Sequence, residues 1–275
     1  MAVGIPTAEQ VAAFQRDGAV FLPGFLAPEL VEQLADGVER EIAEPGPLAI
    51  TMAPADGSGQ FVEDFCRWGD IAEYRAVVAA SGMGRAAAGL MGTGEVRLFH
   101  DHMLVKEAGS SIRTPWHQDQ PYYCIDGSQT ISFWIPLDPV SRAATPEFVA
   151  GSHGGAWFMP RSFLAGNALV FDEGTLEEVP DVEADRDAFP ILGWAMQPGD
   201  AVAFNMLTLH AAGPADSRRR AVSFRLIGED VRYGPRPHRT SPPFPGLDVE
   251  LAAGEPMRVD RLFPVLYRSG SRLAG

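Results

Sequence analysis

The pattern of apolar residues changes at about residue 95, and this change constrains the fold more than any other feature of the sequence. Before that point, apolar side chains recur at helical spacing. After it, short runs rich in β-branched and aromatic residues are separated by Gly, Pro, Asp and Ser, which is typical of many strands joined by turns. Helices followed by strands, without alternation of the two, predict a mainly β protein. We expect a double-stranded β-helix (jelly roll) with N-terminal bracing α-helices.

The N-terminal part is expected to contain three helices and one short strand. Thr7 and Gln10 have the spacing of a capping box, and Gly18 is a suitable residue to end the first helix. A run of apolar residues that stops at a Pro-Gly pair then predicts a strand. The further elements that we expect are this strand at 19–22, helices at about 28–43 and 71–90, and a loop at 45–60.

The second part of the chain predicts the strands of the jelly roll. At 275 residues the chain is long enough for one domain with a full hydrophobic core. We divide this single domain into a helical part at about 1–92, a jelly-roll core at about 93–230, and a proline-rich C-terminal tail or lid at about 231–275. The expected strands are 96–99, 102–106, 130–137, 169–171, 201–204 and 221–227.

Composition excludes several classes of function. The net charge of −14 argues against a nucleic-acid surface, which needs a basic patch, and it disfavours anionic membranes. No apolar run reaches the roughly 18 to 20 residues that cross a bilayer, and no export signal is recognisable, so we expect a cytoplasmic location. Cys66 and Cys124 lack CxxC spacing and are expected to be plain buried thiols. The sequence does not predict the oligomeric state.

A candidate metal site comes from three residues. His117 and Asp119 are two positions apart, so on a strand or its extended end they project to the same side. His210 follows a glycine turn and a predicted strand, which could bring it back as a third ligand. Two imidazoles and one carboxylate leave three positions open on an octahedral metal, an arrangement that suits iron(II) binding a co-substrate and dioxygen. The alternative is a cupin-like site built on His100 and His102, which we otherwise expect to lie on a polar strand face.

A series of motifs surrounds these residues in a fixed order. With them, the chain resembles the phytanoyl-CoA dioxygenase family of iron(II)- and 2-oxoglutarate-dependent oxygenases. The motifs are Asp17-Gly18-Ala19-Val20, Thr114-Pro115-Trp116-His117-Gln118-Asp119, Ser132-Phe133-Trp134, Gly151-Ser152-His153, His210-Ala211-Ala212-Gly213-Pro214 and Arg219-Arg220-Ala221-Val222-Ser223.

The resemblance implies a site and a reaction. The family's iron ligands fall on His117, Asp119 and His210, and its arginine for the distal carboxylate of 2-oxoglutarate falls on Arg219. Iron(II), 2-oxoglutarate and O2 would together oxidise a small molecule with release of succinate and CO2. Because Asp119 is retained, whereas halogenating relatives lack this carboxylate, hydroxylation is favoured. Desaturation, cyclisation or epimerisation at the same centre, or a catalytically silent ligand-binding protein, are the alternatives.

Two departures from the family pattern concern the pocket. Residues 144–147, Ala-Thr-Pro-Glu, stand where relatives usually have an Asn-Gly turn. Ala212 stands where relatives often have a serine two residues after the second histidine. We expect an altered loop at the pocket mouth and one hydrogen bond to the co-substrate that is missing or supplied elsewhere.

Strand alternation supports Arg219 independently of the resemblance. If residues 219–227 form a strand, Arg219, Ser223 and Arg225 share one face, whereas Arg220 lies on the other. The face of Arg220 is otherwise mostly apolar and should pack against another layer. Arg219 is then free to bind a carboxylate with two parallel hydrogen bonds in the cleft between the sheets.

The remaining pocket residues are predicted from neighbouring strands. Lys106 is the only lysine in the chain, and a compact ammonium on this strand could meet a carboxylate of co-substrate or substrate. We expect Arg219, Lys106, Thr130, Trp134 and Ser223 to bind the co-substrate, and Gln118, His102 and Arg225 to line the substrate pocket. The late arginines Arg232, Arg236 and Arg239 are considered as contacts for an anionic group of the substrate, with a plain surface tail as the alternative.

Overall fold

The computed structural model describes residues 5–160 and 176–270, and in these residues strands predominate after a helical beginning. The predicted run 169–171 lies outside the described residues. The helices are α1 (Ala8–Asp17), α2 (Pro28–Ala43), α3 (Ala72–Ala80), α4 (Met83–Met91) and α5 (Leu247–Glu250). The strands are β1 (Ala19–Leu22), β2 (Ile50–Met52), β3 (Phe61–Phe65), β4 (Glu95–Lys106), β5 (Thr114–His117), β6 (Ile125–Asp126), β7 (Thr130–Pro136), β8 (Pro146–Val149), β9 (Ile191–Leu192), β10 (Ala201–Phe204), β11 (His210–Ala212), β12 (Arg219–Gly228), β13 (Arg232–Tyr233) and β14 (Val265–Arg268).

The first helix begins and ends where its sequence predicts. Thr7 Oγ1 accepts a hydrogen bond from the amide of Gln10 at 3.2 Å, and the Gln10 side chain accepts one from the amide of Thr7 at 2.8 Å. Gly18 ends the helix with φ of 76°, a left-handed conformation that glycine adopts without steric cost. The predicted bounds of β1 and α2 are also confirmed.

Three expectations for the N-terminal half are corrected. The single helix expected at 71–90 is two helices, because the chain turns at Gly82 with φ of 71°. The loop expected at 45–60 contains β2, which pairs with β3, a strand that the sequence did not predict. β4 is one continuous strand where two runs were expected. Short strands such as β2 depend on pairing with a neighbour, which local sequence does not encode.

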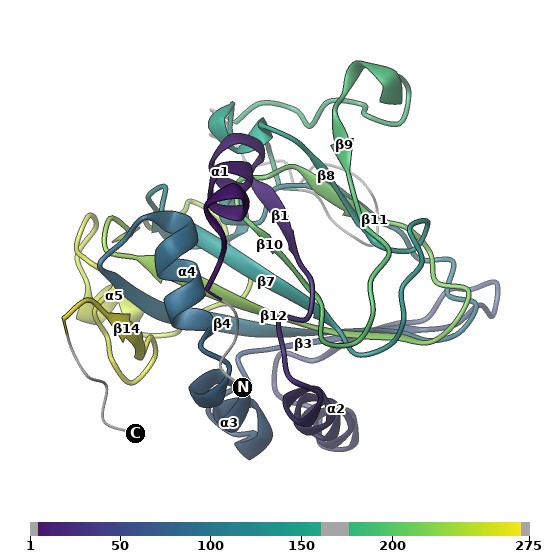
Figure 1. Cartoon of the computed structure of the whole chain (residues 1–275), viewed down its shortest axis with the longest axis horizontal. Coiled ribbons are helices and arrows are strands. Elements are labelled where there is room, and N and C mark those ends of the chain that lie inside the picture. The colour runs from purple at the N-terminus through teal and green to yellow at the C-terminus, as the bar shows by residue number, and fades with distance from the viewer. Residues whose placement is uncertain (1–4, 161–175, 271–275) are drawn as a thin grey trace.

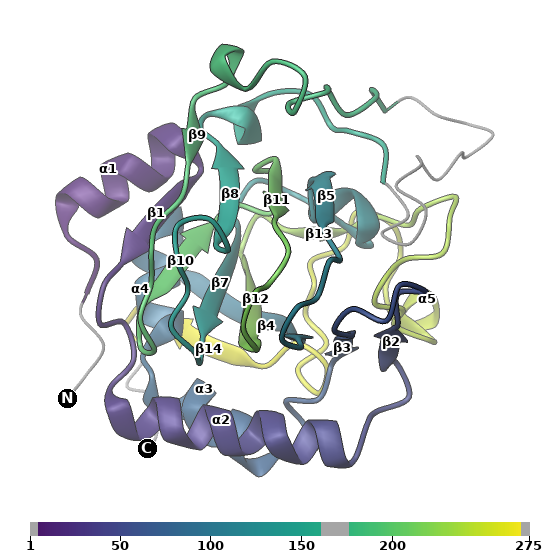
Figure 2. The ribbon, with the colours of Figure 1, turned by 90° about the vertical axis from the view of Figure 1, so that its right-hand side faces the viewer.

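The strands form two antiparallel sheets that face each other, as in a jelly roll (Figure 2). The larger sheet has the order β1-β10-β7-β12-β4-β3-β2, with β14 also paired to β4. The smaller sheet has the order β5-β11-β8-β9. A separate two-stranded ribbon joins β13 to β6. The expected fold class is therefore confirmed.

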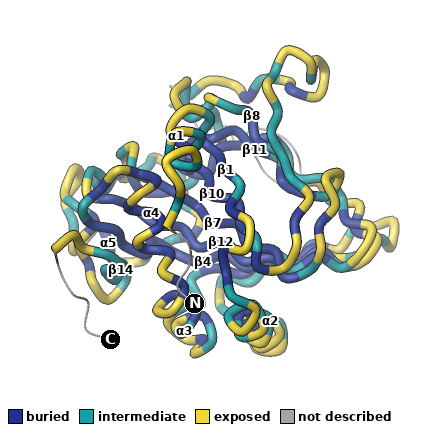
Figure 3. The backbone as a smooth tube through the Cα atoms, in the orientation of Figure 1, coloured by how far each residue is buried: buried dark blue, intermediate teal, exposed yellow. Residues whose placement is uncertain are grey.

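The helices cover one face of the larger sheet. Side chains of α1 to α4, such as Phe14, Leu34 and Tyr74, form one buried cluster with sheet residues such as Phe133 and Phe224. Figure 1 shows α2 and α3 side by side beneath this sheet, and Figure 3 shows its strands buried while the outer turns of α2 are exposed. Burying each such side chain contributes about 1.5–3 kcal/mol. The opposite face of the sheet is left to face the smaller sheet, and the site lies there.

The C-terminal segment up to residue 270 packs into the fold, so the expectation of a tail is corrected. β14 pairs with β4, and β13 pairs with β6. Leu247, Met257 and Phe263 are buried in a second cluster with Phe99. These contacts fix the segment against β4, although its proline content suggested an irregular surface run.

Two smaller expectations concern the thiols and the membrane. Cys66 and Cys124 are both free, and Cys124 is buried, whereas Cys66 is only partly so. None of the helices in residues 5–160 and 176–270 is long and apolar enough to span a bilayer.

Candidate metal centre

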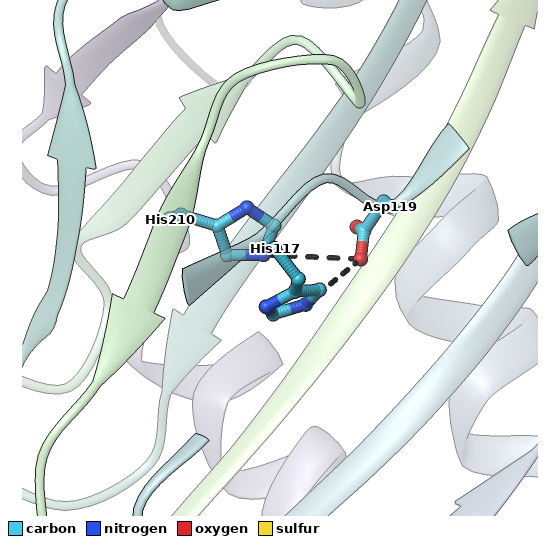
Figure 4. Close-up of side chains that lie close together, drawn as sticks. All are labelled: His117, Asp119 and His210. Atoms are coloured by element: carbon cyan, nitrogen blue, oxygen red, sulfur yellow. Dashed lines mark ion pairs between the residues drawn. The ribbon is translucent and has the colours of Figure 1, made fainter. Parts of the chain in front are cut away.

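Three side chains converge in the cleft between the two sheets (Figure 4). Candidate ligand atoms of His117, Asp119 and His210 lie within 4.8 Å of one another, and all three residues are buried. Nε2 of His117 is 3.5 Å from Oδ1 of Asp119, and Nε2 of His210 is 3.8 Å from the same oxygen. Among the described residues this is the only group of three such side chains with this spacing. The donor set of two imidazoles and one carboxylate fits iron(II).

Backbone pairing brings the two histidines together. His117 is the last residue of β5, and His210, the first residue of β11, is its partner across the ladder. Asp119 lies beyond the strand, in a right-handed helical conformation with φ of −73° and ψ of −46°. Its convergence with His117 therefore comes from the turn and not from strand alternation, which the sequence analysis had assumed.

The backbone also sets the tautomer of each imidazole. Nδ1 of His117 lies 2.8 Å from the carbonyl oxygen of Pro115, and Nδ1 of His210 lies 2.8 Å from that of Thr208. A carbonyl can only accept, so each Nδ1 donates, and the lone pair of a neutral ring is then on Nε2. Burial lowers the pKa of His210 to about 3, which keeps this ring neutral. Both Nε2 atoms are therefore prepared to bind a metal.

Arg225 holds the carboxylate of Asp119 from the other side. Its Nε and Nη2 both lie 3.0 Å from Oδ2 of Asp119, and both side chains are almost fully buried. Although burial acts to raise it, the pKa of Asp119 is held well below its ordinary value by the charge of Arg225 and by the two histidines. The carboxylate thus stays ionised, with Oδ1 turned to the histidines.

Gln118 is placed outside the cavity, so its expected role in the substrate pocket is corrected. Its amide nitrogen donates to the carbonyls of Ala156 at 3.0 Å and Leu207 at 2.9 Å, and its carbonyl accepts from the amide of Phe158 at 2.8 Å. The residue between the two candidate ligands therefore fastens this turn to the segment just before β11.

A cavity of about 90 Å³ opens beside the three candidate ligands. Arg219, Ser223 and Arg225 of β12, Trp134 of β7 and His102 of β4 line it, and all five are residues that the sequence analysis named for co-substrate or substrate binding. Apolar and aromatic side chains make up most of the remaining wall. These side chains are Phe61, Phe65, Leu104, Tyr122, Tyr123, Pro146, Phe204 and Ala211.

The alternation along β12 follows the prediction. Arg219 is buried, and Nη1 donates to the carbonyl of Ala144, while no carboxylate pairs with it among residues 5–160 and 176–270. Burial lowers the pKa of its guanidinium to about 10. Arg220 points to the other face and binds Asp138 at 2.7 Å and Glu39 at 2.8 Å. Of the two arginines, Arg219 has the unpaired charge in the cleft.

Lys106 and Thr130 do not line the cavity, and their expected roles in co-substrate binding are corrected. Lys106 is beside Arg219 in the ladder, but its Nζ donates to the carbonyls of Ile112 at 2.6 Å and Gly213 at 2.9 Å. Burial lowers its pKa to about 7. The hydroxyl of Thr130 donates to Oε1 of Gln120 at 3.1 Å, deep in the structure. Strand alternation predicts which face of the sheet a side chain is on, but it does not predict the hydrogen bonds that Lys106 and Thr130 form there.

The alternative metal pair of His100 and His102 lacks a third ligand in the described part of the chain. His100 is fully buried, with its ring against Phe99 and Tyr123. His102 instead faces the cavity, where Nε2 is 3.3 Å from Oε2 of Glu63.

Sequence reasoning missed the contribution of β3 and of Ser241 to the cavity wall. Glu63 of β3 faces the cavity between Phe61 and Phe65. The alternation of Phe61, Glu63 and Phe65 with Val62 and Asp64 is a period-two signal that could have identified this strand. Ser241 lies in the proline-rich segment, where no periodicity exists to place it.

Comparisons with known proteins agree with this geometry. The family model of phytanoyl-CoA dioxygenase (PhyH) matches residues 14–221. The multifunctional dioxygenase prhA of Penicillium brasilianum is 22% identical over 242 residues, covering 82% of this chain and 73% of that protein.

Solved structures share the fold. The epimerase SnoN from nogalamycin biosynthesis, in complex with Fe3+, α-ketoglutarate and nogalamycin RO, is 22% identical with a TM-score of 0.73, covering 94% of this chain and 97% of that one. The carbocyclase SnoK from the same biosynthesis is 22% identical with a TM-score of 0.71, covering 94% and 96%. EctD from S. alaskensis, with 2-oxoglutarate and 5-hydroxyectoine, is 19% identical with a TM-score of 0.67, covering 91% and 85%.

Proposed function

Because the chain belongs to the phytanoyl-CoA dioxygenase family, we propose that His117, Asp119 and His210 hold the iron(II) of an oxygenase that hydroxylates an unactivated C–H bond of a small molecule. The family makes the protein an enzyme of the 2-oxoglutarate-dependent dioxygenase class, with iron and 2-oxoglutarate as its cofactor and co-substrate. One observation supports the ligand assignment above all. The candidate ligand atoms of His117, His210 and Asp119 lie within 4.8 Å of one another. A backbone carbonyl orients each imidazole, and Arg225 orients the carboxylate.

The chemistry divides between the cofactor and the protein. When bound, iron and 2-oxoglutarate supply the activation of dioxygen, and the overall reaction converts C–H, 2-oxoglutarate and O2 into C–OH, succinate and CO2. The chain's own residues orient the reactants and exclude water. Arg219 is proposed to hold the distal carboxylate of 2-oxoglutarate, because it is a buried guanidinium in the cavity wall without a carboxylate partner of its own among the described residues. Trp134 and Ser223, opposite each other on β7 and β12, would form the floor beside it.

The same iron centre can support oxidations other than hydroxylation. Asp119 favours hydroxylation over halogenation, because the carboxylate occupies the position that a halide would need. Proteins of this fold are named as an epimerase and a carbocyclase, so epimerisation and cyclisation remain alternatives for this chain. A catalytically silent protein is disfavoured by the complete set of three candidate ligands. A cytoplasmic location stays a prediction.

The nature of the substrate is also part of the proposal. The solved neighbours are named with small molecules, nogalamycin RO and 5-hydroxyectoine, and we propose a small-molecule substrate here too. The idea of an anionic substrate loses support, since Arg236 donates to the carbonyl of Tyr123 at 2.8 Å and Arg232 to that of Glu229 at 2.7 Å. Arg236 and Arg239 both line one hollow at the surface, and Arg239 also lines a second one that shares residues with the cavity.

The decisive experiment measures substrate-dependent succinate. Protein reconstituted with iron(II) is screened against a metabolite library for succinate formation coupled to loss of a compound, whose product then identifies the reaction. His117→Ala, Asp119→Ala and His210→Ala should each abolish turnover and leave the fold largely intact. His100→Ala should retain tight metal binding. Full activity in any one of the first three would remove that residue from the site, and the absence of succinate with every compound would favour the silent alternative.

A further inference from the structure

The cavity extends across the large sheet, from Trp134 of β7 at one end to Phe65 of β3 at the other. Ser223 lies on β12 with Trp134 beside it on β7 and His102 beside it on β4. Phe65 of β3 follows next to His102, so β3 is two strands away from the strand that carries Arg219. Asp119, one of the candidate metal ligands, contacts this sheet at Arg225 of β12. β3 therefore lies on one side of β12, and Trp134 of β7 lies on the other side.

The β3 end contains one carboxylate. Glu63 is 4% exposed and lines the cavity, with Oε2 3.3 Å from Nε2 of His102. The His102 ring is stacked on Phe65 with centroids 3.9 Å apart, which fixes its orientation. Burial holds the pKa of His102 below its ordinary value, which favours the neutral ring beside the carboxyl group of Glu63. Its Oε1 accepts no hydrogen bond from the described residues.

Two arginines line the cavity, and neither is proposed to meet Glu63. Arg225 is paired with Asp119, and Arg219, two strands away from β3, is the residue proposed to hold the distal carboxylate of 2-oxoglutarate. Lys106, although close in the ladder, is bound to two carbonyls outside the cavity wall. Arg239 lines a neighbouring surface hollow that shares Phe65 and Ser241 with the cavity, and it therefore stands at the mouth. In protein loaded with 2-oxoglutarate, a further ligand at the β3 end meets the carboxyl group of Glu63.

We propose that the β3 end of the cavity is the substrate subsite, where Glu63 accepts a hydrogen bond from a hydroxyl or ammonium group of a substrate that carries a flat ring. The inference rests on the proposed function, since it assumes that the centre beside it oxidises what binds here. Phe61, Phe65 and Tyr122 supply aromatic walls for the ring. An anionic substrate group at this position would lie against a buried carboxylate, which is costly. The substrate class is thus a neutral or cationic, ring-containing hydrogen-bond donor.

The test uses three probes that share one ring system. Binding of 2-naphthylmethanol, 2-naphthylmethylammonium and 2-naphthoate is measured by ligand-detected NMR titration of the protein loaded anaerobically with iron(II) and 2-oxoglutarate. We expect the alcohol and the ammonium to bind roughly 10-fold or more tightly than the carboxylate. Glu63→Gln should abolish the advantage of the ammonium over the carboxylate. Arg239→Gln, a matched control at the mouth, should leave the order of the three probes unchanged.

The outcomes separate the two proposals. Equal binding of the probes, tighter binding of 2-naphthoate, or no binding of any probe to the loaded wild-type protein would overturn the substrate class. This comparison needs no variant, so it stands even if Glu63→Gln fails to fold. Binding of iron(II) and of 2-oxoglutarate is measured separately in the same preparation. Failure of those two to bind contradicts the proposed function, whereas a reversed order of probes in protein that binds both contradicts only the substrate class.

Discussion

Arg225 binds one oxygen of Asp119, Oδ2, through both Nε and Nη2 at 3.0 Å, while the other oxygen, Oδ1, faces the two candidate histidine ligands. One oxygen of the Asp119 carboxylate therefore binds Arg225, and the other faces the proposed metal position. Nη1 of Arg225 is buried and has no hydrogen-bond partner among the described residues. Arg225 therefore acts as a positioning residue for Asp119.

The first prediction concerns the stability that this pair contributes. Arg225→Gln leaves Asp119 as a buried charge without its partner, which typically costs about 3–5 kcal/mol. A divalent metal can supply the missing positive charge, so metal should restore more stability to the variant than to the wild type. Chemical denaturation of both proteins, with and without zinc(II) as a redox-inert metal, measures this difference.

Arg220→Gln is the matched control for the same change of residue type. Arg220 pairs with Asp138 and Glu39 on the helix-covered face near the surface, so its loss should cost only about 0–1 kcal/mol and should not alter the effect of metal. An Arg225 variant as stable as the wild type without metal would contradict a structural role for the pair.

The second prediction ranks the arginines of β12 for co-substrate binding. Loss of a charge-assisted hydrogen bond typically costs about 1.5–3 kcal/mol, so Arg219→Ala should weaken 2-oxoglutarate binding by roughly 10- to 150-fold. Arg220→Ala should change it little, because its guanidinium points away from the cavity. Both affinities are measured anaerobically with iron(II) present. The reverse ranking would contradict the assignment of Arg219.

How far the sequence could predict this site is clearest on β12 and β3. Alternation along β12 placed Arg219, Ser223 and Arg225 toward the cavity, because a strand with one apolar face has a single stable orientation. Glu63 was missed, because the period-two signal of β3 covers only five residues and two of them are acidic. The pairing of Arg225 with Asp119 joins residues far apart in the chain, and no local pattern contains that information.

The third prediction concerns Lys106, whose isolated occurrence suggested a role in binding. Its Nζ links the carbonyl of Ile112, before β5, to that of Gly213, after β11, and these two strands carry the candidate histidines. Lys106→Met would leave two partly buried carbonyls short of a donor and should destabilise the fold by about 1–3 kcal/mol. We expect a smaller effect on 2-oxoglutarate affinity than that of Arg219→Ala. A larger effect on affinity, with stability unchanged, would restore Lys106 as a co-substrate ligand.

The last prediction concerns Glu41, a buried acid in α2. Its carboxyl group is 1% exposed and accepts a hydrogen bond from the Tyr74 hydroxyl at 2.5 Å, while Oε1 has no partner among the described residues. Burial raises the pKa of Glu41 from its ordinary value of 4.5 to about 8. Between these two pH values the unfolded chain releases a proton that the folded protein retains, so stability falls as pH rises, by up to about 1.4 kcal/mol per pH unit.

Glu41→Gln should remove this pH dependence, because a neutral amide has no proton to release and its oxygen can still accept from Tyr74. The variant is expected to be more stable than the wild type by roughly 2 to 4 kcal/mol at pH 8, with the gain shrinking toward pH 5. Denaturant unfolding at pH 5, 6.5 and 8 measures the trend. Glu32→Gln removes the same charge from an exposed position of α2 and should leave the slope unchanged. If the wild type and Glu41→Gln lose stability in parallel as pH rises, Glu41 is ionised in the folded protein and the assignment of its raised pKa is wrong.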